Sequence, residues 1–299
     1  MQPELAVIIP CYNQGAFVED AIASVQCQTR SDWELIVVDD GSTDSSAIVI
    51  SRMEARDPRI RLIRQPNQGV SRARNRGYRE VSASVRYVLF LDADDQLHPE
   101  MLSTLAHYLD EHPQAGAVFC AFIPVDVHGV PIGANRLFYR PALIPTWWGY
   151  KKLREKTGTV PFISTLANAV NLPSNTLLRR TVFEKVGGWN ETLPQLAEDR
   201  ELFMKLALHS ELHALNIPLM YYRKHKGQSS MQQQLAVQRS SAMIQEWLRY
   251  YQQQPDSKER QQVLRSWHLY MGRIGVVYTF QGGWHHMRRG HVILWVYEI

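Results

Sequence analysis

The chain has 299 residues, enough for two average domains or one large α/β unit. Its composition, 45% hydrophobic and 21% charged, excludes a disordered, collagen-like or low-complexity protein. A net charge of +4 is too small to indicate a polyanion, so no nucleic-acid partner is expected. The three cysteines (Cys11, Cys27 and Cys120) form no C-x-x-C pair, which argues against a disulfide framework or a zinc site.

Apolar runs separated by segments of helical periodicity predict alternating strands and helices in the first half of the chain. The runs start about 30 residues apart, a spacing that suits parallel strands joined by crossover helices. They are continuous rather than alternating, as in strands that are covered on both faces. The predicted strands, at residues 6–9, 35–38, 60–63, 87–91 and 117–122, therefore indicate a doubly wound sheet.

The second half begins with a passage rich in proline and aromatic residues (PALIPTWWGY) and a basic stretch (KKLREK), which together predict a long excursion or a lid. Regular structure is then predicted as a strand at 175–179, a helix at 181–186 that stops at Gly187-Gly188, a helix opening near Glu198, and a strand at 217–222. The residues from 231 onward have helical spacing and predict a helical C-terminal extension.

The N-terminal residues, the lengths of the apolar runs and one C-terminal helical face bear on where the protein is located. The first residues, MQPELAVIIP, do not resemble a secretory signal, and the longest apolar runs, such as 117–123, are shorter than the roughly 18 to 20 residues of a membrane span. A cytoplasmic protein is expected. Near the C-terminus, one helical face could touch an anionic membrane surface, which would place the protein peripherally on the inner membrane face; packing on its own domain is the favoured alternative. That face would carry Trp284, Met287, His291 and Trp295 beside Arg288 and Arg289.

Acidic clusters follow two of the predicted strands, at the edge where open parallel sheets bind ligands. The first, Asp39-Asp40-Gly41-Ser42, would by itself indicate only a turn. The second, Asp92-Ala93-Asp94-Asp95, places three carboxylates in four residues, which favours a divalent cation, Mg²⁺ or Mn²⁺. Because such cations complete their coordination shells with substrate phosphates, a nucleotide diphosphate is the expected ligand. Neither a P-loop nor a G-x-G-x-x-G turn is present, so the charge of that diphosphate would be neutralised by the metal and by scattered cations.

Four motifs in order resemble family 2 glycosyltransferases, the GT-A enzymes that use nucleotide-activated sugars. They are IIPCYN at residues 8–13, WELIVVDDGSTD at 33–44, NQGVSRARNRG at 67–77, and the D-x-D formed by Asp92 and Asp94. The ordered set covers roughly residues 5–230. The resemblance implies a GT-A-type α/β fold, with a doubly wound, mixed but mainly parallel sheet flanked by helices and followed by the helical extension. It also implies a GT-A domain at 1–230, with a nucleotide-binding half at 1–124 and an acceptor half at 125–230, and an extension at 231–299.

The implied activity is the transfer of a sugar, with inversion, from a nucleotide-diphosphate sugar to a hydroxyl group. The donor is UDP-linked in the better-known members, and the acceptor is expected to be a saccharide or a lipid-linked molecule in cell-surface glycan or glycolipid assembly. By resemblance, Pro10 and Tyr12 border the base and ribose, Asp40 accepts a hydrogen bond from the base, and Arg74 lies near the nucleotide. The first alternative for Arg74 is a solvated helix face, since Arg72, Arg76 and Arg79 are equally basic neighbours, and a nucleic-acid-binding patch is a more remote one.

The resemblance also assigns the metal site. Asp94 would bind the cation directly, Asp92 would reach the ribose or a metal-bound water, and His225, in the stretch YRKHKGQSS, would complete the metal site or touch the diphosphate. Asp95 is expected to be a helix N-cap or a turn residue, because Pro99 and an amphipathic helix follow it.

Glu198-Asp199 resembles the E-D pair of the family, and a physical argument supports Asp199 as the base. Apolar residues follow Asp199 at three, four and seven positions, so its carboxylate shares a helical face with core contacts. Glu198 would be a supporting acceptor ligand. The alternative is an acid that merely favours the helix N-terminus.

Two other functions stay open from the sequence. A sugar nucleotidyltransferase would usually carry a G-x-G-T-R loop after the first strand, where this chain has Pro10-Cys11-Tyr12-Asn13. A non-catalytic nucleotide-sugar-binding subunit would bind the donor without turnover.

Overall fold

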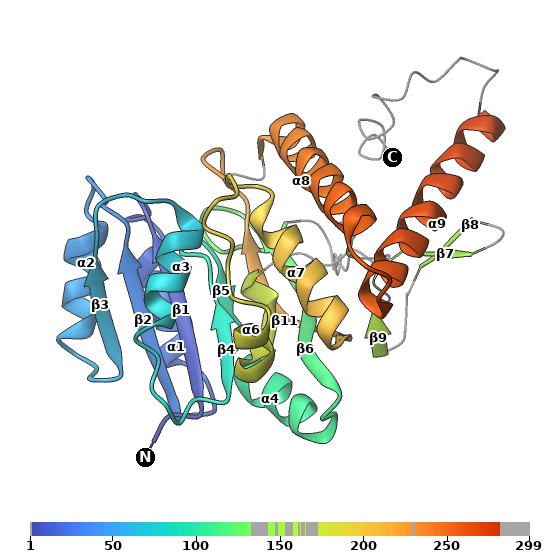
Figure 1. Cartoon of the computed structure of the whole chain (residues 1–299). Coiled ribbons are helices and arrows are strands. Elements are labelled where there is room, and N and C mark those ends of the chain that lie inside the picture. Colours follow the sequence, from blue (N-terminus) through green and yellow to red (C-terminus); the bar gives the residue numbers. More distant parts are fainter. Residues whose placement is uncertain are drawn as a thin grey trace.

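The computed structural model describes residues 2–132, 143–146, 149–152, 158–160, 162, 165, 173–228 and 231–281. The helical face around Trp284 and parts of the Pro- and aromatic-rich passage and of the basic stretch lie outside these residues. Figure 1 shows the arrangement, with the sheet at the centre and the last two helices at one end.

A nine-stranded sheet in the described residues forms the centre of the fold, in the order β3-β2-β1-β4-β10-β6-β11-β5, with β9 paired to β11. Its strands are β1 (Leu5–Cys11), β2 (Trp33–Asp39), β3 (Ile60–Arg64), β4 (Tyr87–Phe90), β5 (Gln96–Leu97), β6 (Ala115–Val125), β9 (Gly158–Val160), β10 (Thr176–Arg179) and β11 (Glu211–Arg223). A separate pair consists of β7 (Leu143–Thr146) and β8 (Gly149–Lys152).

The sheet is mixed and mainly parallel, as expected. The four strands β3, β2, β1 and β4 are parallel, and so are β6 and β11, whereas β10 runs antiparallel between β4 and β6 and β5 runs antiparallel to β11. All predicted strands within the described residues are present. The strand predicted at 217–222 in fact starts at Glu211. The sequence did not reveal its first part because polar residues such as His213 interrupt the apolar pattern. The side chain of His213 is nevertheless buried, and it is hydrogen-bonded to the hydroxyl of Tyr108 at 3.0 Å.

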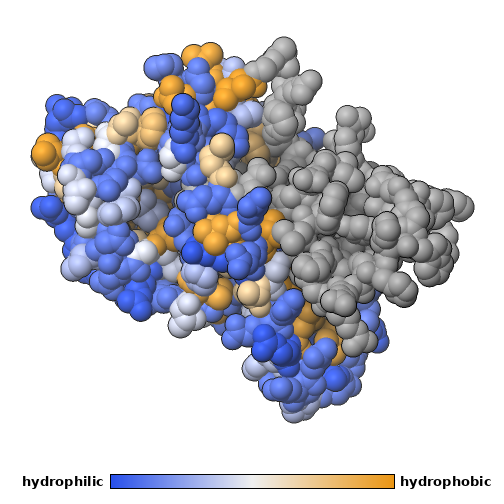
Figure 2. All heavy atoms as spheres, turned by 90° about the horizontal axis from the view of Figure 1, so that it is seen from above, coloured by the Kyte–Doolittle hydropathy of each residue, from blue (hydrophilic) through white to orange (hydrophobic). Residues whose placement is uncertain are grey.

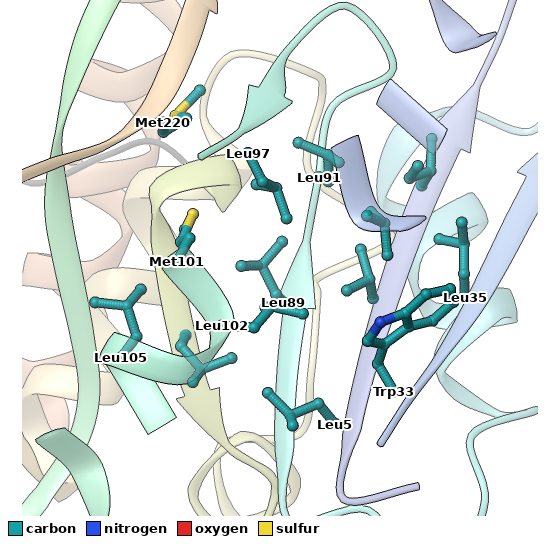
Figure 3. Close-up of a cluster of buried hydrophobic side chains, with 14 of the residues drawn as sticks. Leu5, Trp33, Leu35, Leu89, Leu91, Leu97, Met101, Leu102, Leu105 and Met220 are labelled. Atoms are coloured by element: carbon teal, nitrogen blue, oxygen red, sulfur yellow. The ribbon is translucent and has the colours of Figure 1, made fainter. Parts of the chain in front are cut away.

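Helices cover both faces of the sheet, which explains why the strands read as continuous apolar runs. One face packs against α1 (Val18–Gln26), α2 (Ser46–Glu54) and α4 (Met101–Glu111), and Figure 3 shows this core around Leu5, Trp33, Leu89 and Met101. The other face packs against α3 (Val70–Tyr78), α6 (Arg180–Lys185) and α7 (Glu198–His209). A short 3₁₀ helix, η1 (Pro173–Asn175), precedes β10.

The C-terminal extension is helical over the described residues, as α8 (Gln233–Gln253) and α9 (Lys258–Gln281). A third apolar cluster joins it to α7, through Met204 on one side and Met243, Ile244 and Val263 on the other. In the part of the chain that the structure describes, none of the helices combines the length and apolar character that crossing a bilayer requires.

Gly77 lets α3 lie close against the sheet. A Cβ atom at this position would come within 2.6 Å of the Ile8 Cγ2 atom and 3.1 Å of the Val38 Cγ2 atom, both in the buried core. We therefore expect Gly77→Ala to lower the free energy of unfolding by about 1 to 2 kcal/mol, even though alanine is the better helix former. Urea unfolding checks this value, with Ser51→Ala on the exposed face of α2 as the control that should change little; equal stability of both variants would contradict it.

Candidate functional site

The candidate site lies at the carboxyl ends of β1, β2 and β4, which point to the top of Figure 1. This is the edge at which open α/β sheets bind ligands. Seen from above in Figure 2, the described surface is mostly hydrophilic, with small and separate hydrophobic areas. The surface suits a polar ligand better than an apolar one.

Three residues expected at the nucleotide lie on adjacent strand ends. Pro10 pairs with Val38 across β1 and β2, and the backbone N–H of Asp40 donates to the carbonyl of Cys11 at 2.8 Å. Tyr12, directly after β1, is 48% exposed and available to a ligand. The structure thus brings Pro10, Tyr12 and Asp40 together.

The carboxylate of Asp40 holds the loop that opens α3. It accepts hydrogen bonds from the side chain of Gln65 at 2.7 Å and from the backbone N–H groups of Gln68 and Gly69 at 2.9 and 2.8 Å. The residue is only 3% exposed. Sequence reasoning missed this role of Asp40. The signal that could have indicated it is Gly69, because a glycine before a helix favours a turn, and Gly69 does adopt a φ of 92° there.

Arg74 lies at the centre of the site as a buried cation among three carboxylates. Its guanidinium donates to Asp92 at 2.9 Å and to Asp199 at 3.0 Å, and it lies 3.6 Å from the carboxylate of Glu198. Its side chain is 3% exposed and stacks over the ring of Trp189, with 4.2 Å to the ring centroid. The alternative of a solvated helix face is therefore wrong for Arg74.

The neighbouring arginines do occupy such a face. Arg72, Arg76 and Arg79 are 50%, 38% and 62% exposed. Arg74 differs from these three arginines because it lies on the face of α3 that packs against the sheet. Sequence reasoning missed Trp189, which follows the Gly187-Gly188 pair after α6. Its position, an aromatic residue directly after a helix stop, is the one sequence feature that could have indicated its role at the site.

The two acids that begin α7 have perturbed proton affinities. Burial and the neighbouring charge of Glu198 hold the pKa of Asp199 well above its usual range, although Arg74 lowers it. Burial likewise raises the pKa of Glu198. A carboxylate whose pKa is raised is a stronger base than an ordinary carboxylate, which is the property that general-base catalysis needs.

Asp94 and His225 form a second pair beside this network. The Asp94 Oδ2 atom lies 2.9 Å from the His225 Nε2 atom, and the imidazole packs against the ring of Phe17. Burial and the charge of Asp92 raise the pKa of Asp94. Two residues that are 131 positions apart in the sequence thus meet, as the resemblance implies for a metal site.

Arg223 supports the turn that carries Asp94. Its guanidinium donates to the carbonyl of Asp94 at 3.0 Å and to the carboxylate of Asp20 at 2.8 Å, and its backbone N–H donates to Asp95. Sequence reasoning gave Arg223 no role, although its place two residues before His225, in the stretch YRKHKGQSS, is a signal that could have identified it.

The structure corrects the expectation that Asp95 caps a helix. The residue before α4 is Glu100, whereas Asp95 is buried and its carboxylate accepts from the backbone of β11. The alternative expectation, a turn, is confirmed, because the Asp95 N–H donates to the carbonyl of Asp92 at 3.0 Å. Burial holds the pKa of Asp95 well above its usual range.

The donors around Asp94 fit a hard cation with an incomplete protein shell. Across the described ranges, no three His, Cys, Asp or Glu side chains gather as a closed metal cage. Asp94 and His225 offer one oxygen and one nitrogen, and a buried carboxylate with a raised pKa is stabilised in its ionised form by a nearby cation. Mg²⁺ typically takes one or two carboxylates and completes its shell with water and substrate phosphates.

Comparison with known proteins shows which family this chain is similar to. The family described as "Glycosyl transferase family 2" matches residues 6–187. The uncharacterized glycosyltransferase alr2836 of Nostoc is 31% identical over 245 residues, covering 81% of this chain and 71% of the relative. The uncharacterized glycosyltransferase YibD of Escherichia coli is 44% identical over 102 residues, 34% of this chain and 29% of YibD.

A third relative is named for an activity. The GalNAc(5)-diNAcBac-PP-undecaprenol beta-1,3-glucosyltransferase of Campylobacter jejuni is 39% identical over 111 residues, 36% of this chain and 35% of the relative. For YibD and this enzyme the matched segment is about a third of the relative's own length or less.

Solved structures share the fold at low sequence identity. TarS 1–349 of S. aureus in complex with UDP-GlcNAc has a TM-score of 0.69 at 19% identity, covering 94% of this chain and 75% of that one. The mannosyltransferase PcManGT of Pyrobaculum calidifontis in complex with GDP-Man and Mn²⁺ has a TM-score of 0.60 at 18% identity, covering 95% and 77%. These likenesses confirm the expected GT-A fold.

Proposed function

This chain belongs to glycosyl transferase family 2, and on that premise we propose that it transfers a sugar, with inversion, from a nucleotide-diphosphate sugar to a hydroxyl group of a saccharide or lipid-linked acceptor. We assign donor binding mainly to residues 1–124 and acceptor binding mainly to 125–230, with 231–299 as an extension. Arg74, in the first of these segments, contacts Glu198 and Asp199 in the second.

The observation that carries the proposal is the single ion-pair network around Arg74. It joins Asp92, from the D-x-D turn, to Asp199, which lies 125 positions beyond Arg74 in the sequence. A single displacement needs a base on one side of the sugar carbon and a diphosphate leaving from the other side. One guanidinium nitrogen of Arg74 donates to Asp92 and the other to Asp199, and this contact between the D-x-D turn and the E-D pair supports the assignment of both to one reaction site.

Asp199 is the residue that removes the proton of the acceptor hydroxyl in this proposal, and Glu198 supports the acceptor. Pro10, Tyr12, Asp40, Arg74 and Asp92 surround the nucleotide. Asp94 and His225 would hold Mg²⁺ or Mn²⁺ with Asp92 beside them. Such a cation, when bound, supplies stabilisation of the charge that develops on the departing diphosphate.

The names of relatives indicate the setting. TuaG of Bacillus subtilis is named as a putative teichuronic acid biosynthesis glycosyltransferase, and the Campylobacter enzyme is named for an undecaprenol-linked acceptor. We therefore propose cell-surface glycan or glycolipid assembly, at the cytoplasmic side of the membrane. UDP-linked sugars are the first donors to test, followed by GDP-linked ones, because structures of the same fold hold UDP-GlcNAc and GDP-Man.

A donor screen tests the function. Purified protein is incubated with Mn²⁺ and UDP-, GDP- or dTDP-sugars, with and without saccharide and lipid-linked acceptors, and the products are separated by anion exchange. Release of nucleoside diphosphate supports the proposal. When pyrophosphate is added, formation of nucleoside triphosphate and sugar 1-phosphate would instead identify a nucleotidyltransferase, and tight binding without any turnover would identify a binding subunit.

Metal removal gives a separate expected result. Chelation with EDTA should abolish turnover, and Mn²⁺ or Mg²⁺ should restore it, because Asp94 and His225 alone leave the diphosphate charge uncompensated. Asp94→Asn should raise the Mn²⁺ concentration needed for half-maximal rate by at least about tenfold, since it removes an ionised ligand. Glu100→Gln, an exposed acid six positions away, is the control. Full activity in EDTA would refute the metal assignment.

A further inference from the structure

The segment that leads into α7 contains a strained residue. Leu196 has a φ of +79°, and Asn13 is the only other residue besides glycine with a positive φ in the described part of the chain. A leucine in the left-handed region is unfavourable, because its Cβ crowds the backbone carbonyl, whereas asparagine tolerates this region. The backbone of Leu196 must therefore be held in place by contacts with its surroundings.

Those contacts come from the C-terminal extension. The hydroxyl of Ser240 in α8 donates to the carbonyl of Leu196 at 3.1 Å, and the guanidinium of Arg239 donates to the carbonyl of Gln195 at 2.8 Å. Ser240 is buried, with 6% exposure. Two consecutive carbonyls of the strained segment are thus bound by two consecutive residues of one helix.

The other side of the segment is bound by α7 itself and by the apolar cluster. The N–H of Ala197 donates to the carboxylate of Glu198 at 3.0 Å, and the side chain of Ala197 is buried with Met243 and Ile244 of α8. The strained residue lies three positions before Asp199, so its conformation sets where the first turn of α7 points. Asp199 then meets Arg74 at 3.0 Å.

We propose that α8 is a positioning clamp for the catalytic acids: Ser240, assisted by Arg239, holds Leu196 in its left-handed conformation and thereby places Asp199. This inference rests on the proposed function and assigns a role in catalysis to the helical extension. Ser240 and Arg239 are positioning residues, because they act through the backbone of residues 195–196. If α8 only filled space against α7, its hydroxyl contacts would affect stability but not the rate at saturating substrate.

The chain offers a matched pair of serines for the test. Ser240 binds the strained segment, whereas the hydroxyl of the adjacent Ser241 donates to the carbonyl of Val237 within α8, at 2.6 Å. In the full-length protein, Ser240→Ala should lower kcat about five- to tenfold, the factor expected for one hydrogen bond, with the donor KM unchanged. Ser241→Ala should keep the wild-type kcat and KM.

Leu196→Gly provides a second arm, because glycine adopts a positive φ without strain. In the Leu196→Gly background the clamp is less needed, so Ser240→Ala should lower kcat by a clearly smaller factor than it does in the wild type. Amide hydrogen exchange supplies a readout that does not depend on activity: the N–H groups of residues 196–199 should exchange faster in Ser240→Ala but not in Ser241→Ala.

The outcomes separate the two proposals. Equal kcat and equal exchange for the two serine variants, in a protein that does transfer sugar, would overturn the clamp and leave the proposed function standing. The same fold-loss from Ser240→Ala in both backgrounds would also overturn it. A wild-type protein without turnover on any donor would overturn the proposed function and the clamp together.

Discussion

Asp199→Asn is expected to lower kcat by about a thousandfold while leaving donor affinity within a few-fold of the wild type, because an amide cannot accept the acceptor's proton at neutral pH. The substitution keeps the size of the side chain and an oxygen that can accept from Arg74, so the network around Arg74 should persist. Steady-state kinetics and calorimetric titration of the donor measure the two quantities.

A second carboxylate on the same helix provides the control. Glu201 pairs with Lys205 at 3.1 Å on α7, and Glu201→Gln should retain most of the wild-type kcat. If Asp199→Asn keeps its rate within about threefold, the base lies elsewhere, since a positioned base contributes roughly a hundredfold or more.

The pH dependence of the wild-type enzyme follows from the same carboxyl. Burial and Glu198 hold the pKa of Asp199 above its usual range, and only the deprotonated form can act as base. The rate at saturating substrate should therefore rise with pH through this raised pKa, on an acidic limb that lies above the pH of about 4 at which an ordinary aspartate titrates. An acidic limb at about pH 4 would contradict the environment described for Asp199.

Arg74→Met is expected to give the largest loss of stability, about 2 to 3 kcal/mol at pH 7. Methionine fills much of the same volume but leaves Asp92, Glu198 and Asp199 without the buried cation that neutralises them. This loss of stability is smaller than the usual cost of breaking a buried ion pair, because the side chains of Asp92 and Asp199 are about a third exposed and water partly screens their charges. Activity should be lost as well, because the two acids are no longer held together.

The pH dependence of this loss distinguishes charge from packing. Burial raises the pKa of Glu198 and Asp199, so these carboxyls take up protons at a higher pH than ordinary acids do. The difference in unfolding free energy between Arg74→Met and the wild type should therefore be smaller at pH 5 than at pH 7. Denaturant unfolding at both pH values measures it. Arg76→Met, on the exposed face of the same helix and paired only with Glu80 in the described part of the chain, should cost less than about 1 kcal/mol at either pH. A constant deficit for Arg74→Met across this range would indicate lost packing instead.

Much of the fold could be predicted because its signals are local. Apolar runs separated by turn residues mark β1 to β4 and β6, and a parallel sheet covered on both faces requires them to be continuous. The order of the strands could not be read in the same way. β10 inserts antiparallel between β4 and β6, and β5 pairs with the end of β11, through contacts that the local pattern does not encode.

The candidate site divides along the same line. The amino-acid sequence by itself determined which residue types follow each strand: Asp40 after β2, the D-x-D after β4, and Glu198-Asp199 at a helix start. Only the tertiary structure decided their partners. Arg74, one of four similar arginines in α3 and its end, is the one that faces the sheet and bridges two acidic motifs, and Ser240 and Arg239 hold the turn before Asp199. The physical reason is that propensity and periodicity act over a few residues, whereas these contacts join segments separated by 18 to 125 positions and depend on how whole elements pack.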